Sequence, residues 1–331
     1  MNSKIRWTLP DGVDELLPPR AIKVEGLRRD LIDLYISEGY QFIIPPLIEL
    51  SETLGGEAHE ELSSYAFSFK DDLTGKELSI RPDISEQASR IDAYRIPSEN
   101  EVKLCYAGDV VKKKRPQVLR SRTTIQVGAE IFGAAGITAE LESIQLMVKS
   151  LNKVGLSSIT VNLGHAGFMN QVRNVIQNNI NLDWTKIDKA ISQKSQTDML
   201  SLLPDKTEPW IEDILMNLCE LYGDQTILEK AKNVFGSLED SVLEPIEHLN
   251  NVTKKLNLDQ ETKLHFDLGE LHGFKYHTGI VFSAYNDEAG YSLAKGGRYD
   301  GLRKSKNSAR PAVGFDLDLL AVENLLEKTK G

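Results

Sequence analysis

The chain of 331 residues is long enough for one large domain or two ordinary ones, and its composition excludes several classes of protein. With 40% hydrophobic and 27% charged residues, it is too apolar to be disordered. Its net charge of −10 argues against a protein that coats nucleic acid through its overall field, and its two cysteines cannot form a disulfide framework. No run approaches the ~18 apolar residues of a membrane helix, and the N-terminus lacks the apolar segment of a secretory signal. We therefore expect a soluble, cytoplasmic protein without a membrane or nucleic-acid partner.

The expected elements begin with a long helix. An apolar stripe at helical spacing predicts this helix over 18–38, ended by Gly39, which is free to take a positive φ. An extended run follows at 41–48, where Pro45 and Pro46 favour a sheet edge or an interface. The next patterns predict, in order, a hairpin of strands 64–70 and 76–81, a helix 85–94, strands 102–111 and 124–132, a helix 138–154, a strand 158–163 and a helix 165–178.

The texture of the sequence changes at residue 179. Helical periodicity dominates from 179 to 262, and strand patterns disappear there. Strand-like runs return at 263–268, 276–285, 291–294 and 312–317, before a closing helix that runs to 328. We therefore expect a helical insertion at 179–262 that divides a sheet-containing body into residues 1–178 and 263–331. Because several strands follow one another through short turns, we expect this body to be an α+β fold with a mainly antiparallel sheet.

A basic segment stands out in this acidic chain. Six cations occur within the eleven residues from 112 to 122: Lys112, Lys113, Lys114, Arg115, Arg120 and Arg122. Because like charges at this density repel one another, the segment favours a site for a phosphate-bearing ligand or for an acidic partner surface. A solvated hairpin tip is an alternative of equal weight.

A second group of polar residues lies on strand-like sequence. Alternation along the strand 124–132 places Gln126, Gly128 and Glu130 on one face. Where such a face lines a concavity, a Gln and a Glu can bind a cationic amine or an imidazole, whereas a solvent-facing polar stripe is the alternative. Asp83 and Ser85 stand at the start of the helix 85–94, where either side chain is most often an N-cap.

The last third of the chain holds two further motifs. His272 and His277 are five residues apart on strand-like sequence and would face opposite sides, so we expect no metal site. Paired glycines at 296–297 permit a backbone that leaves a strand to approach a ligand closely, and Arg298 is placed to pair with Asp300, although a plain turn is the alternative. Neither common phosphate-binding glycine loop occurs, nor a nucleophile arrangement, so we expect no catalytic residue and no cofactor.

Taken in order, these motifs resemble the catalytic domain of histidyl-tRNA synthetase, a class II aminoacyl-tRNA synthetase, over nearly the whole chain. The motifs that carry the resemblance are Arg81-Pro82-Asp83, Tyr106-Ala-Gly108, Arg115-Pro-Gln117, Gln126-Val-Gly-Ala-Glu130, Tyr276-His-Thr-Gly279, Gly296-Gly-Arg-Tyr-Asp-Gly301 and Ala312-Val-Gly-Phe315. The resemblance implies a class II synthetase-like antiparallel sheet flanked by helices and a helical insertion. It also implies a dimer interface formed by the first helix and the proline-bearing strand.

Departures from the synthetase pattern fall on its phosphate-binding positions. Where the family has Phe-Arg-x-Glu, this chain has Val111-Lys-Lys-Lys114, and where the family has Gly-Leu-Glu-Arg, it has Asp318-Leu-Leu-Ala321. The leading Arg of the histidine-specific motif is His272. Because adenylation depends on preorganised cations around a polyphosphate, these changes argue against an adenylating enzyme. No anticodon-binding domain is expected after the last helix.

The amino-acid pocket of the family is better kept. The resemblance makes six residues candidates for binding histidine: Asp83, Ser85, Gln126, Glu130, Tyr276 and His277. This combination is similar to the regulatory subunits of short-form ATP phosphoribosyltransferases. It implies a non-catalytic homodimer within a hetero-oligomer, expected to be an octamer, that activates the catalytic subunit in the first step of histidine biosynthesis and takes part in feedback inhibition by histidine. The alternatives are a synthetase-like ligase that adenylates an amino acid for a non-tRNA acceptor, and a tRNA-binding protein, which the net charge disfavours.

Overall fold

The computed structural model describes residues 8–54, 60–96, 98–114, 121–269, 277–300, 304–305 and 308–328. Within these residues, nine strands form one sheet in the order β1-β5-β6-β14-β11-β10-β7-β9-β8. The strands are β1 (Gln41–Ile43), β5 (Val102–Val111), β6 (Thr123–Phe132), β7 (Ile159–His165), β8 (Tyr222–Gly223), β9 (Lys263–Asp267), β10 (Ile280–Asn286), β11 (Ala294–Arg298) and β14 (Ala312–Asp318). In this sheet the pairs β1–β5 and β7–β9 are parallel and the other described pairs are antiparallel, which confirms the expected fold class.

Two smaller sheets accompany the main one. The strands β2 (Ile48–Leu50), β4 (Glu77–Ile80) and β3 (Phe67–Lys70) form the first, and β12 (Lys304–Ser305) pairs with β13 (Ser308–Ala309) in the second. The described helices are α1 (Arg20–Ser37), α2 (Ser51–Leu54), α3 (Glu60–Tyr65), α4 (Ser85–Tyr94), α5 (Ile137–Lys153), α6 (Ala166–Gln177), α7 (Trp184–Ser192), α8 (Gln196–Leu202), α9 (Pro209–Leu218), α10 (Thr226–Phe235), α11 (Asp240–Lys255) and α12 (Leu319–Lys328).

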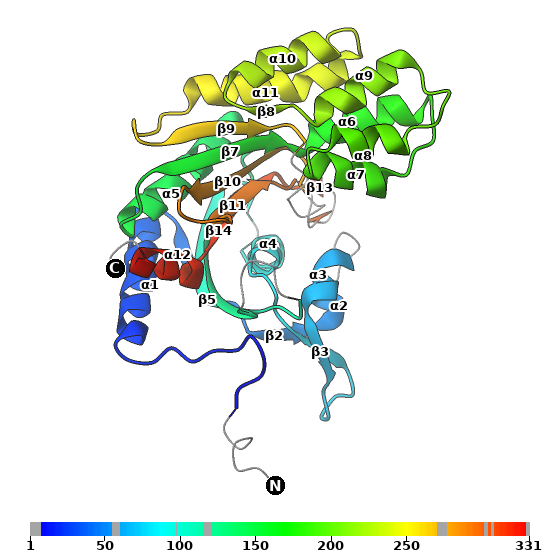
Figure 1. The fold of residues 1–331 in the computed structure, drawn as a ribbon. Coiled ribbons are helices and arrows are strands. Elements are labelled where there is room, and N and C mark those ends of the chain that lie inside the picture. The colour runs from blue at the N-terminus through cyan, green and yellow to red at the C-terminus, as the bar shows by residue number, and fades with distance from the viewer. Residues whose placement is uncertain are drawn as a thin grey trace.

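The helices cover the main sheet unequally. Helices α1, α5 and α12 lie along one side of it, whereas α4 lies on the other side (Figure 1). The helices α6 to α11 gather beyond the strands β7 and β9. Helix α1 turns its apolar stripe inward, where Leu31, Ile32 and Tyr35 are buried, and it is followed by Gly39 at a φ of +89°, as its position predicts. No described helix is long and apolar enough to cross a bilayer.

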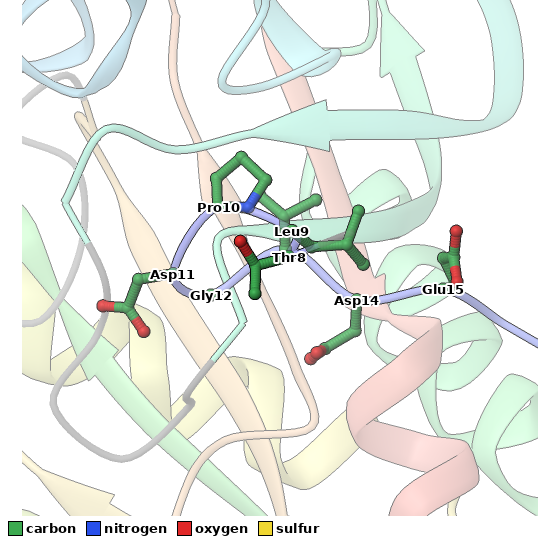
Figure 2. A pocket seen from close by; sticks show the side chains of 8 residues that line it. Thr8, Leu9, Pro10, Asp11, Gly12, Asp14 and Glu15 are labelled. Carbon is green, nitrogen blue, oxygen red and sulfur yellow. The ribbon is translucent and has the colours of Figure 1, made fainter. Parts of the chain in front are cut away.

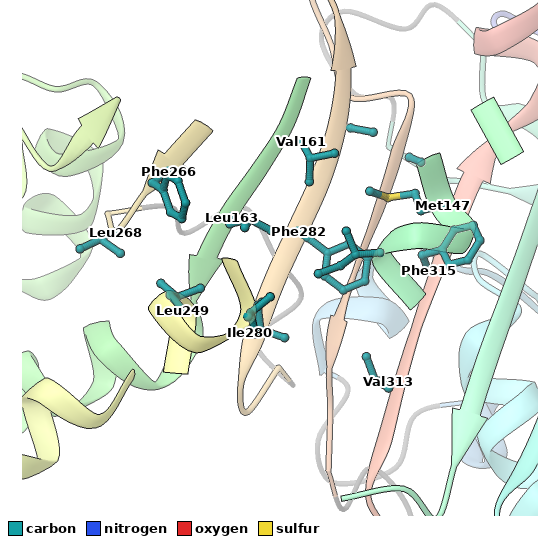
Figure 3. Packing of buried hydrophobic residues seen from close by; sticks show 14 of the residues in the cluster. Met147, Val161, Leu163, Leu249, Phe266, Leu268, Ile280, Phe282, Val313 and Phe315 are labelled. Carbon is teal, nitrogen blue, oxygen red and sulfur yellow. The ribbon is translucent and has the colours of Figure 1, made fainter. Parts of the chain in front are cut away.

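The core fills the side of the sheet that faces α5. Phe315, Phe282, Leu163 and Phe266 all point to this side, from neighbouring strands in register (Figure 3). Leu249 of α11 belongs to the same core, so the helices of residues 184–255 pack onto the sheet through shared apolar contacts. With one side of the sheet taken up by the core, polar side chains that alternate with the core residues are left to the other side.

The sequence prediction of one strand is wrong. A strand was expected at 291–294, with Gly296 and Gly297 where the backbone leaves it, but β11 spans Ala294–Arg298 and includes both glycines. At Gly296 a Cβ atom would overlap the Gly314 carbonyl oxygen and the Phe282 ring, so a glycine is needed inside the strand where neighbouring strands pack tightly.

Candidate functional site

The strand register of the main sheet builds a polar site on the face opposite the core. Val127, Ala129 and Ile131 are buried in the core cluster, and Gln126 and Glu130 alternate with them on the other face, as the sequence predicted. Glu130 lies opposite Gly314 of β14, and Gln126 lies opposite Asp318. The site therefore sits over the middle strands of the sheet.

Glu130 is the centre of a buried hydrogen-bond network. Its Oε1 accepts a hydrogen bond of 3.0 Å from the Tyr106 hydroxyl, and its Oε2 accepts one of 2.5 Å from the Tyr299 hydroxyl. The Ser85 hydroxyl lies 2.9 Å from that of Tyr106. Burial raises the pKa of Glu130 to about 8, although these hydroxyls and Ser85 oppose the shift. The site thus holds a buried carboxyl group whose ionisation is disfavoured by burial and would be favoured by a bound cation.

Space for the Glu130 carboxyl is made by a glycine on the adjacent strand. A Cβ atom at Gly314 would overlap Glu130 Oε2 and come within 2.6 Å of the Ala129 carbonyl oxygen. Any larger residue at 314 would push the carboxylate out of its contacts with the two tyrosines. The Ala-Val-Gly-Phe motif is therefore explained by a packing requirement of the site.

The start of α4 closes one side of the site. Gln126 Oε1 accepts a hydrogen bond of 2.8 Å from the Ile84 backbone N–H, and Asp83 Oδ1 accepts one of 2.7 Å from the Ser85 N–H. The prediction that Asp83 or Ser85 is the N-cap of this helix is wrong, because the N-cap residue is Ile84 and Ser85 is the first residue of α4. Asp83 lies one residue further out and still satisfies a backbone donor of the first turn. Asp83 and Ser85 are both buried. The hydrogen bonds of Ser85 to Tyr106 and of Gln126 to the start of α4 bring them into one cluster with Gln126 and Glu130.

Three charged residues continue this cluster along the sheet. Asp316 lies opposite Gly128 on β6 and opposite Lys295 on β11, and burial raises its pKa to about 6, opposed by the ammonium groups of Lys295 and Lys112. Burial and the nearby Lys295 ammonium lower the pKa of Lys112, while Asp316 and Asp83 oppose this shift. The site therefore offers both carboxylates and ammonium groups beside the Glu130 network.

The described cations of the basic segment lie in different environments. Lys112 is half-buried and belongs electrostatically to the cluster just described, whereas Lys113 and Lys114 are exposed. The Lys114 ammonium lies 5.6 Å from the centre of the Tyr65 ring, and the Arg122 guanidinium lies 4.6 Å from that of Phe67. Arg115 and Arg120 lie outside the described residues.

The two remaining histidine-binding candidates differ. The His277 ring centre lies 6.5 Å from that of Tyr299 in an edge-on arrangement, which places His277 beside the Glu130 network. Tyr276 lies outside the described residues. The predicted pairing of Arg298 with Asp300 is confirmed by a hydrogen bond of 3.2 Å.

Two other kinds of candidate site in the described residues are a metal site and a hollow near the N-terminus. Among the described residues, no group of three or more His, Cys, Asp or Glu side chains is arranged to hold a metal ion. A hollow of about 630 Å³ is lined by residues 8–15, among them Asp11, Asp14 and Glu15 (Figure 2). Its lining comes from a single stretch of chain, whereas the polar cluster around Glu130 joins side chains from β5, β6, β14 and α4. We therefore take the polar cluster as the candidate site.

Comparisons with known proteins identify the family of the chain. A family model described as Histidyl-tRNA synthetase matches residues 12–322. The chain belongs to this family. A protein of Teredinibacter turnerae named ATP phosphoribosyltransferase regulatory subunit is 37% identical over 325 residues, which cover 97% of this chain and 82% of the relative. One of the same name from Alkalilimnicola ehrlichii is 38% identical over 317 residues, with coverages of 95% and 79%. The chain is thus a member of the regulatory-subunit branch of the family, and the resemblance found in the sequence is confirmed.

Solved structures share the fold of this family. The chain superposes with a TM-score of 0.83 and 24% identity on a Bacillus halodurans protein titled ATP phosphoribosyltransferase regulatory subunit/histidyl-tRNA synthetase, covering 98% of this chain and 84% of that one. It superposes with a TM-score of 0.77 and 17% identity on histidyl-tRNA synthetase from Nostoc sp. PCC 7120, covering 98% and 76%. The synthetase-like fold expected from the motifs is therefore confirmed.

Sequence reasoning missed four residues of the site, namely Tyr106, Tyr299, Lys295 and Asp316. Two signals were available for the tyrosines. Tyr106 alternates with Gly108 on a strand, and Tyr299 belongs to the Gly296–Gly301 motif that resembles histidyl-tRNA synthetase. Lys295 and Asp316 face each other only through the pairing of β11 with β14, which no local pattern specifies.

Proposed function

We propose that this chain is the non-catalytic subunit that activates the short catalytic subunit of ATP phosphoribosyltransferase and takes part in feedback inhibition by histidine. The names of its relatives support the regulatory role and the catalytic partner. The observation that carries the histidine part is the Glu130 network, in which a buried carboxyl group is held by Tyr106 and Tyr299.

Each part of histidine has a complementary group in the site. The imidazole is a cation or hydrogen-bond donor that Glu130 accepts, and its arrival favours ionisation of a carboxyl group whose pKa is otherwise about 8. Asp83 and Asp316 supply negative charge for the α-ammonium group. The Lys112 ammonium supplies positive charge for the α-carboxylate. The bound carboxylate would in turn offset the repulsion between Lys112 and Lys295.

The non-catalytic part of the proposal is supported by the residues at the phosphate-binding positions. Ala321 is buried where the synthetase pattern has an Arg. Lys114 lies against the Tyr65 ring where the pattern has a Glu. The first substitution removes a cation that would stabilise the charge developing on ATP during adenylation, and the second reverses the charge at a position of the motif.

The homodimer is proposed at the surface formed by α1 and the proline-bearing segment. Ile22, Ile44, Leu47 and Ile48 are apolar and exposed there, with 82% of Ile44 accessible. Burial of such side chains against a second copy would remove them from water. We expect two or more such dimers to join catalytic subunits in an octamer.

In this scheme the catalytic subunit has an active and an inactive form. Binding of this chain favours the active form, and histidine favours the inactive one, each in proportion to its difference in affinity for the two forms. A calorimetric titration of histidine into the isolated chain and into the complex tests the sensor role. We expect histidine to bind to the wild type and not to the Glu130→Gln variant. If histidine binds neither to the isolated chain nor to the complex, the proposal is contradicted. ATP–pyrophosphate exchange that depends on histidine would favour the ligase instead.

A further inference from the structure

Strand β11 connects the candidate site to the opposite side of the sheet. Gly297 and Tyr299 face the site, and Arg298 between them points into the layer that holds α5. Arg298 is only 5% exposed, and its buried guanidinium group is held by hydrogen bonds. Its Nε donates a hydrogen bond of 2.5 Å to Glu140 Oε1, and its terminal nitrogens donate to the carbonyl oxygens of Ala134 and Gly136 and to Asp300, each at 3.2 Å.

Glu140 relays this contact to the helices of residues 184–255. It lies on α5 and is 1% exposed, and its second oxygen is 2.6 Å from Nε2 of His248 on α11. Burial alone would raise the pKa of Glu140, but hydrogen bonds from His248 and Arg298 hold it below the usual value. Glu140 is therefore a carboxylate shared by a strand of the sheet and a helix beyond it.

The His248 ring has a second buried neighbour. Its centre lies 5.4 Å from that of His165, at the end of β7, and His165 Nδ1 accepts a hydrogen bond of 3.1 Å from the Gly167 N–H. The position of α11 is thus fixed by directional contacts as well as by apolar packing. A buried carboxylate with two such partners tolerates little displacement, because loss of either partner leaves charge without compensation.

We propose that Glu140 and Arg298 are positioning residues of the candidate site, and that they couple Tyr299 to α11. A shift of Tyr299, when Glu130 releases or gains its hydroxyl contact, moves the neighbouring Arg298 and with it the Glu140–His248 contact. In the reverse direction, a force on α11 from a bound partner changes the geometry at Tyr299. The regulatory meaning of this coupling rests on the proposed function, but the coupling itself is a property of the chain alone.

A double-mutant cycle on the full-length chain tests the coupling without any ligand. Tyr299→Phe removes the hydroxyl donated to Glu130, and His248→Ala removes the contact with Glu140. Native-state hydrogen exchange of the α11 amides is measured in the wild type, both single variants and the double variant, with α12 as the internal control. We expect Tyr299→Phe to accelerate hydrogen exchange in α11 about three times as much as in α12. This selective effect is expected to disappear in the variant that also carries His248→Ala.

A conservative variant separates positioning from general stability. His248→Gln keeps a side-chain donor within reach of Glu140, so it is expected to restore the selective effect of Tyr299→Phe that His248→Ala removes. Equal acceleration in α11 and α12, or additive effects of the two substitutions, would overturn the proposal. The exchange experiment contains no histidine, so its result does not depend on histidine binding. A chain that fails to bind histidine would contradict the proposed function and leave the coupling between Tyr299 and α11 unchanged.

Discussion

At the scale of single residues, the proton of Glu130 has a measurable consequence for stability. The pKa of this carboxyl group is about 8 in the folded chain and near its ordinary value of 4.5 in the unfolded chain. Between these values the unfolded chain releases the proton and the folded chain keeps it. The free energy of unfolding contributed by this group therefore falls as pH rises from about 4.5 to about 8, by at most about 1.4 kcal/mol per pH unit.

Glu130→Gln removes this titration and keeps the size of the side chain. We expect the variant to lose less stability than the wild type as pH rises through this window, as measured by urea unfolding at several pH values. Asp316, whose pKa is raised to about 6, contributes a slope of the same sign that both proteins retain. Identical slopes in the two proteins would contradict the assignment of a raised pKa to Glu130.

A methyl group at Gly314 tests the packing around the same carboxyl group. Because its Cβ atom would overlap Glu130 Oε2, Gly314→Ala is expected to destabilise the chain by about 1–3 kcal/mol and to abolish histidine binding in calorimetry. Gly290→Ala is the matched control, since nothing lies within 4 Å of a Cβ atom there. Normal binding by Gly314→Ala would show that histidine does not use Glu130.

The residues of the site were partly predictable from sequence. Alternation placed Gln126 and Glu130 on one face, and helix-start chemistry placed Asp83 beside the α4 terminus. Tyr299 and Lys295 were not predicted as site residues, because their neighbours in the site come from strands distant in sequence. The inward position of Lys112 was also missed, since a run of cations by itself suggests an exposed segment.

At the scale of elements, two ion pairs join α1 to α12, and they differ in how far the carboxylate is buried. Arg20 pairs at 2.7 Å with Glu323, which is 2% exposed, whereas Lys23 pairs at 2.8 Å with the exposed Glu327. Arg20→Met leaves the Glu323 carboxylate buried without its cation, so we expect a loss of about 1–3 kcal/mol in chemical denaturation. Lys23→Met is expected to cost less than about 0.5 kcal/mol. Equal losses would contradict the buried role of Glu323.

The exposed part of the basic segment provides a test of partner contact. Lys113→Glu combined with Lys114→Glu reverses two exposed charges, and we expect weaker assembly with the catalytic subunit, most clearly at low salt. Lys206→Glu, an exposed charge beyond α8, is the control and is expected to assemble normally. Analytical ultracentrifugation measures both. If the double variant assembles like the control at low salt, the segment is not part of the interface.

Local pattern predicted most elements but not their partners. Helices such as α1 and α5 followed from apolar periodicity, and strands close to β5 and β6 were expected from their sequence patterns. The parallel pairs β1–β5 and β7–β9 were not specified, because each joins segments separated by many residues. The glycines of β11 were expected to lie beyond the end of a strand, because a glycine inside a strand is explained only by the neighbours that crowd it.

At the scale of the whole molecule, a synthetase-like sheet keeps a buried polar site while the phosphate-binding positions differ. The division of the chain into a body and an insertion at 179–262 stays a prediction, although α11 shares the core of the sheet. In the proposed scheme the chain changes the populations of its partner's forms, so its effect is measured in the assembled complex.

The rate of phosphoribosyl-ATP formation by the short catalytic subunit, measured with and without this chain and with added histidine, tests the central claim most directly. The account predicts that the chain increases the rate and that histidine suppresses the increase. The suppression is expected to weaken in Glu130→Gln, while activation without histidine remains. No increase in rate, together with no complex on size-exclusion chromatography, would contradict the regulatory role.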